Sequence, residues 1–191
     1  AALADAGVDF VKIYELVTPE VFDALATAAT QRGLPIAAHV PLSMRAREVA
    51  SRVNSMEHIR NVEMDCAAEP DRLLAARRAA LVEDLEEPGA TWRARLHTLQ
   101  RLPAIAAYDS GECDQALAAM VNTIQVPTLR LNAFPLRPVF ARDNFFEAIE
   151  GAPDAIATGW MTAGETWRAE RPAADTVFAA WSLRLVGEMC R

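Results

Sequence analysis

Short apolar runs separated by amphipathic stretches dominate the first half of the chain. Residues 8–14 (VDFVKIY), 34–40 (LPIAAHV) and 54–59 (NSMEHI) each have the length and apolar content of a strand. Stretches of helical character lie between them, at 18–33 and 43–52. Strands and helices that alternate at this spacing are typical of parallel βα units, whose right-handed crossovers place successive strands side by side.

The first of these helices has signals at both ends. Thr18 supplies an N-cap hydroxyl, Pro19 occupies the first helical position, and Gly33 is expected to close the helix. Its expected apolar face consists of Val21, Phe22, Leu25 and Ala29. In the turn before the third strand, Asn54 is expected to adopt a left-handed backbone.

The second half of the chain is less regular. Residues 61–109 are rich in Arg and Glu and are expected to form a helical insertion. A helix over 111–122 leads to a fourth strand at 125–132, and 133–172 is expected to be a long loop-rich segment with short helices. Apolar residues recur at helical spacing near the end of the chain: Val177, Trp181, Leu185 and Met189. Breaks in the insertion are expected at Pro70, Pro88-Gly89 and Pro103.

Composition narrows the class of protein. The 191 residues fit a single domain over residues 1–191, and a net charge of -7 argues against a nucleic-acid partner. No apolar run approaches the roughly 20 residues of a membrane span. The three cysteines are widely spaced and predict no disulfide framework, which favours a reducing, cytoplasmic location. They are Cys66, Cys113 and Cys190.

Both ends have the pattern of a chain that continues. The helix expected at 1–6 ends at Gly7 but has no N-cap, and the last helix has no clear terminator before Arg191. We therefore expect the domain to be an incomplete one.

The chemistry of the chain centres on Lys12. It is the only lysine among nineteen basic residues, and it lies inside the first apolar run. His39 and His58 lie near the carboxyl ends of the next two expected strands. Because ligand sites of parallel α/β folds lie at these ends, the three side chains are expected to converge. Strand alternation would place Met56 and His58 on the same face, with Glu57 on the opposite one.

These residue types suit a metal site. Two neutral imidazoles are good ligands for zinc and similar divalent ions. A free ammonium would repel a cation, but carboxylation by CO2 turns a lysine into an anionic oxygen ligand that can bridge two metals. Arginine cannot react in this way, which gives a reason for lysine in an arginine-rich chain.

Residues 9–41 (from DFVKIY to AAHVP) and 54–61 (NSMEHIRN) resemble the middle of a metal-dependent amidohydrolase of the prolidase-like and imidazolonepropionase-like branch. Residues 108–129 are similar to that family's approach to its seventh strand. The resemblance implies an α/β fold, a partial TIM (β/α)8 barrel of roughly strands four to seven with a helical insertion. It also implies metal ligands at Lys12, often carboxylated in the family, and at His39 and His58.

The resemblance implies one or two divalent ions, zinc for preference, in the complete protein. A metal-activated water would hydrolyse an amide, peptide or cyclic C–N bond of a small-molecule or peptide substrate. The family's His-x-His pair of strand one and its aspartate of strand eight do not occur in this chain. The isolated chain is therefore expected to be inactive and to hold no catalytic residue. Tyr14 and Arg130 lie near strand ends and are expected to bind substrate, although packing and a salt bridge would also explain them.

Two other classes of function stay open. The chain could be a non-catalytic α/β module that binds a metal or small molecule, or a structural, oligomerising domain with incidental histidines. A partial barrel would expose the edges of its outer strands and its inner face. We therefore expect self-association of the isolated chain, as a homo-oligomer.

Overall fold

The computed structural model describes residues 2–83, 95–129, 144–170 and 173–190. Between these ranges it also describes 133, 134, 136, 138 and 142. The chain forms two compact units, Ala1–Thr128 and Leu129–Arg191, and the expectation of one domain over the whole chain stays a prediction. Among the described helices, none combines the length and the apolar content needed to cross a lipid bilayer.

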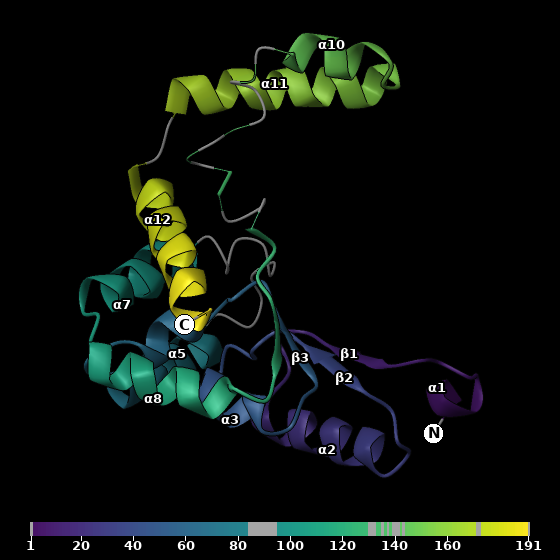
Figure 1. Ribbon diagram of the computed structural model, residues 1–191, viewed down its shortest axis with the longest axis vertical. Helices are drawn as coiled ribbons and strands as arrows, with labels where there is room; N and C mark the ends of the chain where they lie inside the picture. Colours follow the sequence, from purple (N-terminus) through teal and green to yellow (C-terminus); the bar gives the residue numbers. More distant parts are fainter. Residues whose placement is uncertain are drawn as a thin grey trace. The chain divides into compact units, whose positions relative to one another are not determined.

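The first unit contains four strands and the helices between them (Figure 1). The strands are β1 (Val11–Ile13), β2 (Ile36–Ala38), β3 (Ser55–Glu57) and β4 (Ile124–Val126). The helices that precede and connect the first three are α1 (Ala2–Asp5), α2 (Pro19–Thr30) and α3 (Ala46–Ala50). All neighbouring strands are parallel, in the order β1-β2-β3-β4, which confirms the expected α/β class. Each strand is shorter than the apolar run that predicted it.

The register of the sheet decides which side chains share a face. Lys12 pairs with Ala37, and Ala37 pairs with Ser55. Lys12 and Tyr14 are exposed on this face, which would line the interior of a barrel. The opposite face is buried by the helices, and Figure 1 shows α2 beneath β1 and β2. Its core side chains are Ile13, Ile36, Ala38 and Met56.

Helix α2 begins as its sequence predicts. The Thr18 hydroxyl accepts a hydrogen bond of 3.3 Å from the N–H of Val21, and Gly33 closes the helix with φ of 66°. Its buried residues are Phe22, Ala26 and Ala29. The prediction that Val21 and Leu25 also belong to the buried face is wrong, because both are exposed. The buried stripe is thus one of small residues around a single phenylalanine.

Asn54 shapes the turn before β3 through its side chain. Its backbone is not left-handed, so that prediction is wrong. Instead the side-chain Oδ1 accepts a hydrogen bond of 2.8 Å from the N–H of Ile36, the first residue of β2. The N–H of Asn54 donates to the carbonyl of Ile36 at 2.9 Å, so Asn54 extends the pairing of the two strands.

Helices follow β3 through the described parts of residues 61–109. They are α4 (Val62–Asp65), α5 (Pro70–Glu83), the π-helix η1 (His97–Arg101) and α7 (Leu102–Ala106). Helix α8 (Ser110–Met120) then leads to β4. Pro70 begins a helix, where its missing N–H removes no needed hydrogen bond. The break expected at Pro103 is wrong, because η1 runs directly into α7 and the helical run continues through this proline. The expected break at Pro88-Gly89 lies outside the described residues.

A buried arginine organises these helices. The Arg77 side chain is 1% exposed, and its Nε donates to Gln100 Oε1 at 2.5 Å. Its second donor reaches Asn61 Oδ1 at 2.9 Å, and the Asn61 amide donates to the carbonyl of Val40 at 2.9 Å. Burial lowers the pKa of Arg77 to about 10, and the nearby Glu63 carboxylate opposes that shift. Asn61 therefore connects the helical region to the loop after β2.

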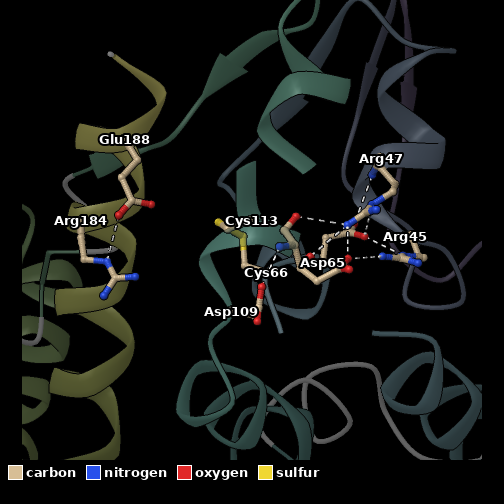
Figure 2. Close-up of a disulfide and its surroundings, with 9 residues drawn as sticks. Arg45, Arg47, Asp65, Cys66, Asp109, Cys113, Arg184 and Glu188 are labelled. Carbon is tan, nitrogen blue, oxygen red and sulfur yellow. Dashed lines mark hydrogen bonds and ion pairs between the residues drawn. A yellow bond between two sulfur atoms is a disulfide. The ribbon is translucent and has the colours of Figure 1, made fainter. Parts of the chain in front are cut away.

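A disulfide joins Cys66, at the end of α4, to Cys113 on α8 (Figure 2). Both cysteines are fully buried, and the N–H of Asp109 donates to the carbonyl of Cys66 at 2.9 Å. The prediction that the chain has no disulfide is wrong. The pairing comes from the tertiary approach of the two helices, and the 47-residue separation gives no local signal for it. Cys190 has a free, exposed thiol.

Helices make up most of the described part of the second unit. Its helices are α10 (Phe145–Glu150), α11 (Asp154–Glu170) and α12 (Ala173–Met189). Helix α11 has 17 residues, longer than the short helices expected in this stretch. Pro153 immediately precedes it and accepts from the N–H groups of Ile156 and Ala157, which sets the first turn. The final helix was expected from its apolar spacing.

Candidate functional site

The three residues expected to bind metal lie on consecutive strands. Lys12 is the central residue of β1, while His39 and His58 follow the last residues of β2 and β3. The imidazole rings of His39 and His58 lie edge to face, with centroids 4.7 Å apart and an interplanar angle of 83°. The sheet therefore brings two imidazoles together at the carboxyl ends of neighbouring strands.

His58 reaches this position through an unusual backbone. The register places Met56 opposite Ala38, on the buried face, so regular alternation would send His58 there too. Instead His58 and Ile59 adopt positive φ angles of 65° and 48°, and the chain turns as β3 ends. The expectation that alternation places Met56 and His58 together on the face of His39 is wrong. His58 does lie beside His39, but the turn brings it there, and Met56 is on the opposite face. Such backbone strain costs about 1–3 kcal/mol per residue and is often found at functional sites.

Each imidazole has an oxygen beside its Nδ1 atom. His58 Nδ1 and Thr128 Oγ1 are hydrogen-bonded at 2.6 Å, and His39 Nδ1 lies 3.7 Å from Glu15 Oε2. A histidine that binds metal usually engages its second ring nitrogen in a hydrogen bond, which orients the ring, and His58 does so through Thr128. The His39–Glu15 contact is longer than a hydrogen bond, and it places the carboxylate on the Nδ1 side of the ring, so Nε2 is the nitrogen of each ring on the side away from these oxygens.

Sequence reasoning missed Glu15 and Thr128. Glu15 carried a signal, because it follows β1 on the strand's buried side and an acid at a buried position needs a partner. Thr128 carried none, since a threonine after a strand is common. Its φ of 49°, which is rare for a β-branched residue, is visible only in the structure.

Lys12 faces a carboxylate. Its Nζ lies 3.8 Å from Glu57 Oε1, and the Ser55 hydroxyl donates to the same oxygen at 3.1 Å. The prediction that Glu57 points to the opposite, helix-facing side is wrong, because the register places Glu57 on the face of Lys12. Burial lowers the pKa of Lys12, and the Glu57 charge opposes that shift.

Tyr14 lies against the candidate site. Its ring stacks on the His39 ring with centroids 4.2 Å apart, and the residue is 53% exposed. It therefore both packs against His39 and presents surface to solvent. Arg130, the other residue expected to bind substrate, lies outside the described residues.

The electrostatics of the site favour neutral imidazole at His58. Burial lowers the pKa of His58, and the neighbouring His39 and Arg60 lower it further. A neutral imidazole is the form that binds metal. Within the described ranges, however, no group of three or more His, Cys, Asp or Glu side chains is arranged to hold a metal ion. The donors present are two imidazoles and the Lys12 amine, which fit part of a site.

Comparison with known proteins supports the fold assignment. No protein-family model and no curated protein sequence matches the chain. A solved structure, "AH, Bottromycin amidohydrolase", matches 96% of the chain with a TM-score of 0.57 and 21% sequence identity. The match covers 34% of that structure's own chain, so this chain spans about a third of its length. The chain thus has the fold of part of an amidohydrolase, consistent with a partial barrel.

Proposed function

We propose that this chain supplies strands four to seven of a metal-dependent amidohydrolase barrel. In this proposal Lys12, His39 and His58 bind a divalent ion, zinc for preference. The observation that carries it is the approach of His39 and His58, 4.7 Å between ring centroids at the ends of adjacent strands. Two imidazoles together with an anionic oxygen fit the ligand preferences of zinc.

Each residue has a distinct role in the proposed site. The Lys12 side chain is 38% exposed, so its amine is accessible to CO2 and can become the anionic oxygen ligand. His39 and His58 supply nitrogen ligands, each with its Nδ1 next to an oxygen. Tyr14 and Arg130 are proposed to line the substrate pocket. A bound metal would lower the pKa of a water and polarise the carbonyl of an amide, peptide or cyclic C–N substrate.

Metal binding by the isolated chain tests the proposal. Titration with Zn²⁺ in a calorimeter should show binding, and His39→Asn or His58→Asn should weaken it by about 100-fold or more. That estimate follows because losing even an outer partner of a metal ligand costs about 10–100-fold. His97→Asn is the matched control: it removes the remaining histidine of the chain, which lies in η1, and should bind like the parent. Equal affinity in all four proteins would refute the assignment.

The role of Lys12 has its own test. With ¹³C-bicarbonate and Zn²⁺ present, a carbamate carbon signal should appear in the NMR spectrum of the parent chain. Lys12→Arg keeps the positive charge but cannot be carboxylated, so the Zn²⁺-dependent signal should be absent, and any signal that remains comes from the α-amino group. Because Lys12 is the only lysine, a carbamate signal at a side chain has a single possible origin.

A non-catalytic binding module is the second candidate. It is favoured by the donors that the described residues bring together, two imidazoles and the Lys12 amine, which could hold a ligand without forming a whole catalytic centre. The similar structure carries the name "Bottromycin amidohydrolase", so amide substrates are the first to test. The complete polypeptide that contains this chain should hydrolyse an amide, and His39→Asn should abolish the reaction. Metal binding without hydrolysis would support the module instead.

A further inference from the structure

Glu15 is a buried carboxylate that the proposed chemistry does not use. It follows β1 closely and is 1% exposed. Its Oε2 atom lies 3.7 Å from His39 Nδ1 and 3.7 Å from a terminal nitrogen of Arg60. One carboxylate oxygen is therefore shared between the first imidazole of the candidate site and a cation.

The backbone holds Glu15 and His39 next to each other. The N–H of His39 donates to the carbonyl of Ile13 at 3.0 Å, and the N–H of Leu42 donates to the carbonyl of Glu15 at 2.8 Å. These hydrogen bonds continue the pairing of β1 and β2 beyond both strand ends. The approach of the two side chains is thus fixed by the main chain.

Glu15 is the neighbour that can decide which edge of the His39 ring points into the candidate site. Tyr14 stacks on the ring and His58 meets it edge to face, but aromatic contacts of this kind do not distinguish Nδ1 from the carbon across the ring. A carboxylate beside Nδ1 does distinguish them, because it favours the tautomer with hydrogen on Nδ1. The Nε2 lone pair is then available on the far side of the ring.

The cost of burying Glu15 also points to a role. An isolated buried carboxylate is unfavourable by several kcal/mol, so such groups persist where they have charged partners. Arg60 provides the balancing charge, with a terminal nitrogen 3.7 Å from Glu15 Oε2. The same oxygen lies 3.7 Å from His39 Nδ1. Long contacts of this kind often shorten when a ligand binds.

We infer that Glu15 is a positioning residue: it fixes the ring orientation and the Nδ1–H tautomer of His39, and so aims Nε2 into the candidate site. The value of this orientation for metal binding rests on the proposed function. The tautomer itself does not, because it is a property of the metal-free protein.

The test begins without metal. Protein with ¹⁵N-labelled histidine is studied by long-range ¹H–¹⁵N correlation NMR at about pH 8, where histidine is ordinarily neutral. In the parent chain, His39 should show hydrogen on Nδ1 and an unprotonated Nε2. Glu15→Gln should produce a mixture of tautomers, while Glu69→Gln, which neutralises an exposed glutamate paired with Arg72, should leave the His39 signals unchanged. An Nε2–H tautomer in the parent, which needs no variant to detect, would overturn the inference.

Zn²⁺ binding separates this inference from the proposed function. If the parent binds, Glu15→Gln should weaken binding by about 10–100-fold, and Glu69→Gln should not. Equal affinity of parent and Glu15→Gln would overturn the positioning role even though the metal site is real. If the parent does not bind Zn²⁺, the proposed function fails, and the tautomer measurement alone decides the role of Glu15.

Discussion

His58 and Thr128 share a hydrogen bond of 2.6 Å, and both hold a left-handed backbone, with φ of 65° and 49°. They follow the adjacent strands β3 and β4, so the bond closes the end of the sheet. The N–H of His58 also donates to the carbonyl of Val126 at 2.7 Å. Two strained residues that stabilise each other indicate that the position of the His58 ring is specified and is not a by-product of packing.

The hydroxyl of Thr128 should therefore matter for ligand binding. Thr128→Val keeps the shape but removes the oxygen beside Nδ1, and we expect Zn²⁺ affinity to fall by about 10–100-fold. Thr128→Ser keeps a hydroxyl and should bind within a few-fold of the parent. Calorimetric titration of the three proteins measures this, and equal losses in both variants would show that the hydroxyl is not the relevant group.

The pH dependence of stability should carry a contribution from His58. Its pKa is lowered below the ordinary value of 6.5, so the unfolded state binds more protons than the folded state as pH falls through this region. The contribution to stability is therefore present above 6.5 and is lost as the pH falls through the folded pKa. His58→Gln should flatten this loss, as measured by urea unfolding with chelator at about pH 7.5 and about pH 5.5. An unchanged difference between the two pH values would contradict the shift.

Reduction should destabilise the first unit. The Cys66–Cys113 disulfide closes a loop of 47 residues, for which the chain-entropy estimate is about 4 kcal/mol. Cys113→Ala should lower the free energy of unfolding by up to about that amount and make it insensitive to dithiothreitol. Cys190→Ala, at an exposed thiol, should behave like the parent. Urea unfolding with and without reductant measures both effects. The same free energy of unfolding of the parent chain in both conditions would argue against the disulfide.

Arg77 should be far more important for stability than exposed arginines. Removing its side chain takes a donor from the buried oxygens of Gln100 and Asn61 and leaves Glu63 with Arg101, at 3.2 Å, as its cation. Arg77→Ala should therefore cost about 3–5 kcal/mol. Arg72→Ala removes an exposed arginine of the same helix, α5, which is paired with Glu69 just before the helix, and should change stability by less than about 1 kcal/mol. Thermal or urea unfolding compares them; similar costs would show that burial of Arg77 contributes little.

The isolated chain should self-associate through its sheet. Ile124 and Val126 of β4 are exposed on the face of Lys12, and β1 and β4 are the outer strands of the described sheet. Light scattering during size-exclusion chromatography should show dimers or larger species at micromolar concentration. Ile124→Lys should shift the distribution towards monomer. A monomeric parent would contradict this expectation.

Much of the first unit could be predicted because its signals are local. The strand and helix order follows from apolar runs, and the start of α2 follows from Thr18 and Pro19. The placement of His39 near His58 could also be expected from strand ends. The way in which His58 reaches His39 could not be predicted, because the turn at His58 depends on two positive φ angles that no residue type there suggests.

The predictions that are wrong depend on tertiary structure. Alternation within one strand does not give the register between strands, so the sequence does not decide which face Glu57 occupies. The disulfide was missed because it depends on the packing of α4 against α8. Helical spacing predicts which residues of α2 share a face, but it does not predict how much of that face packs against the sheet. Val21 and Leu25 lie on the part that stays exposed.

The Asn61 side chain has a consequence for how this protein can change. Its amide joins the Val40 carbonyl, one residue after His39, to Arg77 in α5. The helices after β3 are therefore not an accessory that can be exchanged for another of similar length. A replacement segment would need its own donor for the Val40 carbonyl and its own acceptor for the guanidinium. Exchange of this segment between relatives should therefore be tolerated only when the residues equivalent to Asn61 and Arg77 are transferred together.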